Sequence, residues 1–523
     1  MNFGLVLRRF AWMLGVIAAA MGLAGVLQAL GLLGEPASAL SARAAARSLG
    51  LASGLTGVAA GLSWALARPR EGARLNRRDA LLLVAMGWLL GAAAAAVPFW
   101  LWVRLAGDDG GAGVDHVFRS AAACYFEAMS GLSTTGATVL GDAGSRIEGL
   151  PRGLLLWRAL SHWLGGLGIV VLVVALLSGT GAGGRRLLRA EAAGSSATGV
   201  RQRVEASARL VWVIYVVLTG TQTLILGLLG MPWFDAICHS LSDLATGGLS
   251  TRDASIGAYY DTPGVEATVT VFMVLAGVNF ALYDRLVRRD FNAVWRDAEL
   301  RVYLGLLLLA TAVVAVWTWG VPVPTTAGGA SSAGLGGATR DAAFQVTAIQ
   351  TGTGFGTVDY EGWPFGPRAI LVALMFVGGM TGSTTGGLKV ARVMVLAKLA
   401  WAELERAFRP QVVKPVTLGG RVIDPEEVRA VPVYLLLTLL LIAGGATAVM
   451  LVEPEGTLSF GSAASAAVST LMNIGPGVGA VGPTENYGFF SPASLGVLSL
   501  LMCLGRLELF AVLVLVSPRF WRG

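Results

Sequence analysis

The chain has 523 residues, of which 55% are hydrophobic and only 14% are charged. A soluble domain carries roughly 25% charged residues, so this composition excludes a chain of several soluble domains and indicates a membrane protein with many crossings. Basic residues exceed acidic ones by 39 to 32, but no basic run is long enough to follow a nucleic-acid backbone, so we expect no nucleic-acid partner.

Ten apolar stretches reach the length of about 20 residues that a helix needs to cross a bilayer. Four shorter apolar stretches lie between spanning segments, and each ends in a segment rich in Gly, Thr and Ser. Short segments of this kind are often re-entrant. The predicted spans cover 10–33, 46–67, 79–103, 154–178, 208–229, 265–285, 300–320, 367–397, 431–452 and 491–516, and the half-length segments cover 117–133, 233–246, 341–351 and 459–472.

The distribution of positive charge predicts the orientation. Of the 39 Lys and Arg residues, 28 fall in segments on one side of the predicted layout. Cytoplasmic loops carry an excess of Lys and Arg, so we expect both termini in the cytoplasm and all four half-length segments on the outer side. The segments with excess charge are 1–9, 68–78, 181–209, 284–301, 389–429 and 517–523.

An internal repeat organises the chain. We predict an all-α polytopic membrane protein with two N-terminal helices, followed by four pseudo-symmetric copies of helix, pore loop and helix around a central ion pore. The predicted units are 1–70 for the leading helices and 71–180, 181–290, 291–429 and 430–523 for repeats 1 to 4. The glycine-rich segments align on Gly136, Gly248, Gly354 and Gly477.

These glycine-rich segments are the strongest candidates for a binding site. Non-helical backbone at membrane depth is tolerated only where it is buried in protein or lines a water-filled cavity. Glycine lets backbones approach closely, and carbonyl oxygens that face a pore can replace the hydration shell of a cation. For a single segment, an ordinary turn or a close helix crossing is the alternative; four equivalent segments favour a ring around one axis.

Two further segments carry possible function. GGMTGSTTGG at 378–387 interrupts an apolar run, so we expect a helix to unwind there, either as a packing kink or as an intramembrane loop that obstructs the pore. Arg506 lies inside a predicted span, where a charge is costly and usually functional. A salt bridge to another helix is the alternative; Glu508, two residues further on, does not share its helix face.

Asp235, His239 and Asp243 recur every four residues, so they share one helix face. This spacing can hold a metal, but it also fits the polar face of a re-entrant helix near an outer vestibule. In the vestibule interpretation, acidic residues raise the local cation concentration, together with Asp108, Asp109 and Asp115.

The pore segments, in their order and spacing, resemble the filter loops of the Trk/Ktr/HKT superfamily of potassium transporters, and most closely the membrane subunit of bacterial Trk uptake systems. SHWLGGLGIVV at 161–171 is similar to the second helix of the first repeat, and FVGGMTGSTTGGLKVARV at 376–393 to the broken helix of the third. PVTLGGRVID at 415–424 and LGRLELFAVLVL at 504–515 are similar to the following cytoplasmic segment and the last helix.

The resemblance implies a potassium selectivity filter and a gate. Glycine at all four aligned positions favours potassium over sodium, and the loop with Lys389 and Arg506 would control the pore. The implied filter residues are Thr134, Thr135, Gly136, Ala137, Thr246, Gly247, Gly248, Leu249, Gly352, Thr353, Gly354, Phe355, Gly475, Pro476, Gly477 and Val478, and the implied gate residues are Gly378, Gly379, Gly382, Ser383, Thr384, Gly386, Gly387, Lys389 and Arg506.

The expected function is therefore potassium uptake across a bacterial inner membrane, without catalysis, without a transition metal and with K⁺ as the transported ion. The resemblance also implies a homodimer in lipid and a cytosolic ring of nucleotide-binding regulatory subunits, for which 181–209 and 389–429 are candidate docking segments. Two alternatives stay open: a secondary transporter, either a K⁺/H⁺ or K⁺/Na⁺ symporter or a carrier of another small solute, and a membrane metalloenzyme built on Asp235, His239 and Asp243.

Overall fold

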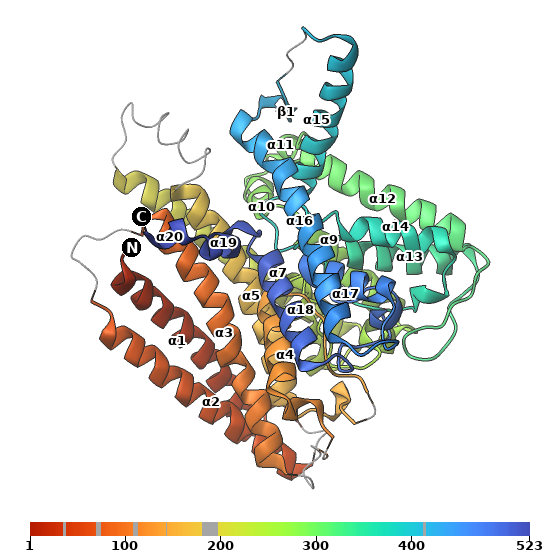
Figure 1. Ribbon diagram of the computed structural model, residues 1–523. Coiled ribbons are helices and arrows are strands. Elements are labelled where there is room, and N and C mark those ends of the chain that lie inside the picture. The colour runs from red at the N-terminus through yellow and green to blue at the C-terminus, as the bar shows by residue number, and fades with distance from the viewer. Residues whose placement is uncertain are drawn as a thin grey trace.

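The computed structural model describes residues 1–34, 38–68, 75–107, 113, 115–142, 144–179, 197–411 and 415–522. The prediction of an all-α protein is confirmed, because the described residues form helices apart from one short hairpin (Figure 1). The elements are α1 (Phe3–Ala29), α2 (Ala39–Leu66), α3 (Arg77–Ala106), α4 (Ala121–Ser133), α5 (Arg152–Gly179), α7 (Ala197–Leu228), α8 (Trp233–Leu244), α9 (Pro263–Ala276), α10 (Phe280–Val287), α11 (Phe291–Trp295), α12 (Ala298–Thr318), α13 (Leu335–Gln350), α14 (Phe365–Met375), α15 (Val390–Phe408), β1 (Thr417–Leu418), β2 (Arg421–Val422), α16 (Pro425–Val452), α17 (Phe460–Met472), α18 (Pro492–Arg506), α19 (Phe510–Leu513) and α20 (Pro518–Arg522).

Within the described ranges, six helices are long and apolar enough to cross a membrane, and two bent helix pairs raise the number to as many as eight. The six are α1, α2, α3, α7, α12 and α16. The remaining predicted spans, 154–178 and 367–397, correspond to α5 and to the pair α14 and α15.

Two spans predicted as continuous helices, 265–285 and 491–516, are instead sharply bent. The axes of α9 and α10 meet at 98°, and those of α18 and the segment from Phe510 at 112°. In the first bend, the Asn279 side chain accepts a hydrogen bond from the Ala281 amide (2.9 Å), which caps a new helix. In the second, Glu508 and Leu509 have φ of 55° and 59°, which a right-handed helix does not accommodate.

The four half-length helices form a closed ring with their neighbours. Each one contacts the second helix of the repeat that precedes it: α8 contacts α5, α13 contacts α9, α17 contacts α14, and α4 contacts α18. Figure 1 shows the last of these pairs, where the C-terminal α18 lies beside α4 from the first third of the chain. The fourth repeat therefore packs onto the first and closes the circle.

Burial differs strongly between this ring and the outer helices. Phe126, Met129 and Ser130 on α4 are fully buried, and most of the other half-helices is buried in the same way. In contrast, Leu308 and Trp317 on α12 are 70% and 53% exposed. An apolar exterior around a buried, partly polar interior suits a protein whose outer helices face lipid.

The two chain ends lie at the same end of the molecule. Val6, Leu82 and Phe520 form one buried cluster, and the Asn2 amide donates a hydrogen bond to Asp79 Oδ1 (2.9 Å). Figure 1 shows the N and C labels close together. An even number of crossings, as the sequence predicts, brings both ends to one side.

Candidate functional site

A left-handed residue follows each half-helix. Such a backbone costs a residue with a Cβ atom ~1–2 kcal/mol, so the surrounding structure must enforce it where the residue is not glycine. Two residues later, each loop has a glycine with positive φ. The left-handed residues are Thr134, Thr246, Gly352 and Asn473, with φ of 52°, 54°, 68° and 56°, and the glycines are Gly136, Gly248, Gly354 and Gly475, with φ of 79°, 77°, 72° and 99°.

The four glycines interlock in sequence around a ring. A Cβ added to Gly136 would overlap the carbonyl oxygen of Gly247 in the next repeat. The same relation holds between Gly248 and the Thr353 carbonyl and between Gly354 and the Ile474 carbonyl, and a Cβ on Gly475 would lie 2.7 Å from the Thr135 carbonyl oxygen. Only glycine fits at these positions, and each loop brings one backbone carbonyl against the next loop.

The fourth repeat corrects the alignment made from the sequence, which placed Gly477 in this row. Gly477 lies two residues further on, and its backbone serves other contacts: its carbonyl accepts a hydrogen bond from the Tyr360 hydroxyl (2.6 Å), and its amide bonds the Val481 carbonyl (2.6 Å). Val478 is also displaced, with its amide bonded to Ser465 Oγ (2.7 Å). The equivalent of Thr134 is Asn473, which sequence reasoning missed although Asn is the residue besides Gly that most readily adopts this backbone.

Side chains behind the ring hold the loops in place. Thr135 Oγ1 shares a hydrogen bond with Ser133 Oγ (2.7 Å) and accepts one from Asn473 Nδ2 (2.9 Å). In repeat 3, Thr353 Oγ1 shares one with Thr351 Oγ1 (2.8 Å). These threonine hydroxyls therefore serve the scaffold, which leaves the backbone carbonyls as the groups presented by the loops.

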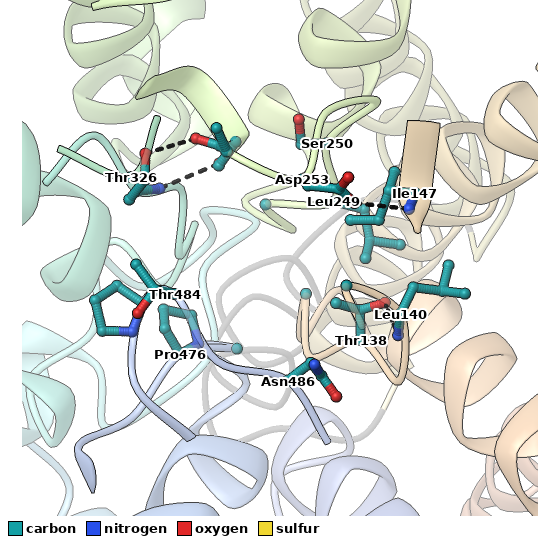
Figure 2. A pocket seen from close by; sticks show the side chains of 18 of the residues that line it. Thr138, Leu140, Ile147, Leu249, Ser250, Asp253, Thr326, Pro476, Thr484 and Asn486 are labelled. Atoms are coloured by element: carbon teal, nitrogen blue, oxygen red, sulfur yellow. Dashed lines mark hydrogen bonds between the residues drawn. The ribbon is translucent and has the colours of Figure 1, made fainter. Parts of the chain in front are cut away.

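A cavity of about 350 Å³ opens on one side of the ring. All four repeats line it, through Gly136, Gly248, Gly354 and Gly475. Figure 2 shows this cavity from close by, with Thr138, Leu249, Thr326 and Pro476 around it and the hydrogen bond from the Ile147 amide to Asp253 (2.7 Å) at its edge. Such a vestibule gives a small hydrated ligand access to the ring.

The residues that follow the glycines differ in their surroundings. Ala137, Leu249 and Phe355 are buried, and Phe355 packs against His239 with ring centroids 5.8 Å apart. Pro476 takes the same place in repeat 4, where it is only half-buried, and it lines the cavity together with Ala137 and Leu249. The ring is therefore regular at its glycines and irregular just beyond them.

The predicted interruption at 378–387 is present, because α14 ends at Met375 and α15 begins at Val390. The loop abuts the ends of the half-helices on the other side of the ring from the cavity. Thr384 Oγ1 donates to the Leu244 carbonyl (3.1 Å), and a Cβ on Gly386 would lie 2.5 Å from the Met472 carbonyl oxygen. The remaining gate candidates, Gly378, Gly379, Gly382, Ser383, Gly387 and Lys389, belong to the same segment, with positive φ at Gly382 and Gly387.

Arg506 joins this loop to the ring. Its side chain is 2% exposed, and its guanidinium donates to the Thr384 carbonyl (2.8 Å) and to the Gly165 carbonyl of repeat 1 (3.2 Å). Glu508 pairs with Arg392 instead, as expected for a residue that does not share the Arg506 face. A buried arginine thus bonds directly to the only break in the third repeat's second helix.

A buried carboxylate also holds the loop, and sequence reasoning did not single it out. Glu299 Oε1 accepts hydrogen bonds from the Thr381 amide (2.7 Å), the Thr381 hydroxyl (3.1 Å) and the Ala391 amide (3.1 Å). Lys389 stays local, since its ammonium donates to the Thr385 carbonyl and hydroxyl. Acidic residues at helix starts are common caps, so the sequence alone gave no reason to connect Glu299 with 381–391.

The row Asp235, His239 and Asp243 does not form a metal centre. Asp235 accepts from Thr251 (2.8 Å) and is bonded to Arg252 and Tyr259, and Asp243 accepts from Gln222. Among the described residues no group of three His, Cys, Asp or Glu could hold a metal ion.

Two predicted acidic vestibule residues, Asp108 and Asp109, lie outside the described residues, as does the stretch 181–196 of the first basic docking segment. Asp115 is described and exposed. The three cysteines, Cys124, Cys238 and Cys503, are free and buried.

Comparison with known proteins shows which protein family the chain is similar to. The profile of the TrkH cation transport proteins matches residues 115–522. The chain is 35% identical to the Trk system potassium uptake protein TrkH of Salmonella typhimurium, covering 87% of this chain and 88% of that protein. It is 31% identical to the protein TrkI of Halomonas elongata, covering 99% and 98%. The crystal structure of the potassium transporter TrkH from Vibrio parahaemolyticus matches over 100% of both chains, with a TM-score of 0.83 and 28% identity.

Proposed function

We propose that this chain, which belongs to the TrkH family of cation transport proteins, takes up potassium ions across the membrane. The related proteins are named as potassium uptake proteins, and the chain is a multi-pass membrane protein by fold. One observation supports the location of the transport site: the ring of Gly136, Gly248, Gly354 and Gly475.

Selection at this ring follows from carbonyl coordination. The oxygens of Thr135, Gly247, Thr353 and Ile474 accept no hydrogen bond among the contacts of the described residues. A desolvated cation would supply the partner that these oxygens require. Each half-helix also directs the negative end of its dipole toward the ring, which favours a cation there.

We assign control of ion flow to the loop between α14 and α15 and to Arg506, which lies beside this loop. The loop lies against the half-helix ends, and the guanidinium adds a positive charge at the inner side of the ring. A cation that leaves the ring meets both, so passage requires the loop to move. The driving force is the membrane potential, worth ~2.3 kcal/mol per charge per 100 mV.

Topology and partners complete the proposal. The excess of basic residues places both termini in the cytoplasm of a bacterial cell, and the shared location of Val6 and Phe520 supports a common side for them. The relatives' names refer to a Trk system, which supports a multi-component assembly. We place a homodimer and a cytosolic nucleotide-binding ring in that assembly, with the segment 389–429 as one docking surface.

The test is growth of a strain that lacks its own potassium uptake systems, with rubidium uptake measured in parallel. Expression of the chain together with the regulatory subunit from the same source should restore growth at low potassium. A folded, membrane-inserted protein that restores neither growth nor rubidium uptake would overturn the assignment.

A further inference from the structure

The side chain seven residues before each left-handed residue differs among the four repeats. This position holds Glu127, His239, Gln345 and Ala466 in repeats 1 to 4. The position lies about one and a half turns before the end of the half-helix, and in repeats 1 to 3 its side chain reaches the segment that leaves the ring. Among the four, only repeat 1 has a carboxyl group, which makes this position chemically unequal around an otherwise regular ring.

In repeats 1 to 3 this side chain bonds the extended segment that follows the ring glycine of the same repeat. Glu127 Oε2 accepts from the Val139 amide (3.0 Å), and His239 Nε2 shares a hydrogen bond with Ser250 Oγ (2.9 Å). Gln345 Nε2 donates to Thr357 Oγ1 (3.3 Å). The contact is therefore a recurrent device that fixes the strand just beyond each glycine.

Repeat 1 strengthens this device with a buried arginine from α5. Arg158 and Glu127 have side chains only 2% and 0% exposed, and their closest N–O distance is 2.8 Å. The same guanidinium donates to Thr138 Oγ1 (3.2 Å) and crosses to the Ser250 carbonyl of repeat 2 (3.0 Å). Thr138 and Ser250 each lie two residues past their ring glycine, so one side chain spans two adjacent loops.

We propose that the Glu127–Arg158 pair is a positioning brace that fixes the separation of the first two loops and thereby sets which ion size the ring prefers. This inference rests on the proposed function, because it assigns a specificity role within that ring. Charge-assisted hydrogen bonds are shorter and about twice as strong as neutral ones, so a braced pair of loops resists opening or closing. A purely hydrophobic replacement would often stabilise the fold equally well, which makes specificity the better reason for burying two charges here.

The brace acts beside one of the close contacts of the ring. A Cβ on Gly136 would overlap the Gly247 carbonyl, so repeats 1 and 2 are in direct contact at that point. A change in the angle between the loops alters the spacing of the Thr135 and Gly247 oxygens. Small ions such as sodium need shorter oxygen distances than potassium does, so a looser pair of loops loses its preference for the larger ion.

The experiment compares Glu127→Gln and Arg158→Gln with Arg158→Lys. Glu127→Gln keeps the volume and Arg158→Gln shortens the side chain, and each variant loses one charge. Lys keeps the charge but, as a point donor, cannot serve both loops. We expect the sodium-to-rubidium uptake ratio to rise roughly tenfold in the Gln variants, which corresponds to ~1.4 kcal/mol of discrimination, with a smaller rise in Arg158→Lys. Arg288→Gln, which breaks the exposed pair of Arg288 with Asp284 on α10, is the matched control and should keep the wild-type ratio.

A second readout separates this inference from transport itself. Ions that bind the folded protein raise its melting temperature, so the concentrations of K⁺ and Na⁺ that stabilise purified protein in detergent report ion preference without uptake. If the brace sets ion preference, the difference between the K⁺ and Na⁺ concentrations needed to stabilise the protein becomes smaller in both Gln variants. Variants that purify in wild-type yield and keep the wild-type preference overturn the brace, whether or not the chain transports; an inactive wild type with a normal preference overturns the proposed function alone.

Thr138→Ala keeps both charges, so it tests the brace even if the charge variants do not fold. This change removes only a hydroxyl, which contacts both Glu127 and Arg158. It should shift the ion ratio in the same direction by about twofold to threefold. An unchanged ratio in a stable Thr138→Ala protein counts against the brace.

Discussion

The ring of glycines and the loop between α14 and α15 are built on opposite plans. The ring is made four times, from backbone atoms, with the same sign of φ at corresponding positions in every repeat. The loop is made once, and side chains from elsewhere hold it: Arg506 from α18 and Glu299 from α12.

In the proposed function, this difference separates ion recognition by the ring from control of ion flow by the loop. A ring of backbone carbonyls cannot change without moving four half-helices that are buried and packed against the helices of neighbouring repeats. The loop depends on a few side-chain hydrogen bonds, each worth about 1–3 kcal/mol when a charged group takes part. The protein can therefore keep its selectivity rigid while a small free energy shifts the loop.

The largest expected effect comes from the ring. Gly136→Ser places a Cβ on the Gly247 carbonyl at a residue with φ of 79°. We expect rubidium uptake to fall roughly 100-fold, equivalent to ~2.7 kcal/mol, with weaker discrimination against sodium in the remaining flux. Gly461→Ala on α17, where an added Cβ meets nothing closer than 3.8 Å, should be silent; a normal sodium-to-rubidium ratio in Gly136→Ser would remove this residue from the filter.

The register of repeat 4 gives the next effect. Gly475→Ala forces a Cβ to 2.7 Å from the Thr135 carbonyl at φ of 99°. Gly477 has an ordinary φ, and an added Cβ there is closest to two side chains, Ser465 and Val481, rather than to a carbonyl of the ring. We expect rubidium uptake to fall roughly 30-fold in Gly475→Ala and less than about threefold in Gly477→Ala. The reverse order would restore the alignment made from the sequence.

Release of the loop should raise flux rather than reduce it. Arg506→Ala removes the donors to Thr384 and Gly165 together with the positive charge. We expect rubidium efflux from proteoliposomes without a regulatory subunit to increase about fivefold, with ion selectivity unchanged. Arg506→Lys should lie between wild type and Arg506→Ala, and a flux that stays at the wild-type level in both would place the arginine outside the gate.

We expect a smaller increase in flux when the second contact that holds the loop, at Glu299, is weakened. Glu299→Gln keeps an acceptor for the Thr381 amide but loses the charge, so rubidium efflux should increase about twofold. The control is Glu453→Gln, another carboxylate that accepts from a backbone amide, Ser491 (2.8 Å), at the start of α18. Equal increases in both variants would show a general loosening of the protein rather than an effect on the loop.

The smallest effect tests the metal interpretation of α8. His239 bonds the Asp235 carbonyl and Ser250 Oγ, so its role is structural, and treatment of purified protein with EDTA should change neither melting temperature nor rubidium uptake. Loss of uptake on chelation, restored by a transition metal, would falsify this reading.

The sequence predicted the half-helices closely where their boundaries carry clear signals. The segment predicted at 459–472 corresponds to α17, Phe460–Met472, because Ser459 caps its start and Asn473 ends it. The start of α13 was missed by several residues, since Gly336, Gly337 and Thr339 do not read as an apolar helix.

The errors have a common physical cause. The register of repeat 4 and the role of Glu299 depend on contacts between segments far apart in the sequence. The bend at Asn279 also meets such a contact, because the Phe280 amide donates to the Gly382 carbonyl (3.2 Å). Two glycines two residues apart, Gly475 and Gly477, look equivalent in the chain, and only the Thr135 carbonyl of another repeat distinguishes them. Local patterns predict where a helix breaks but not which neighbour the break touches.

The closure of the ring by α4 and α18 has a consequence for how such a pore changes over time. A pore assembled from four identical subunits alters all four positions with each mutation. Here the quarters are encoded separately, so Pro476, Glu127 or Asn473 can each be changed while three quarters stay as they were. In the proposed function, the ion preference can therefore change through a substitution in one repeat alone. A substitution that would disrupt the ring if all four repeats carried it can be tolerated in a single repeat.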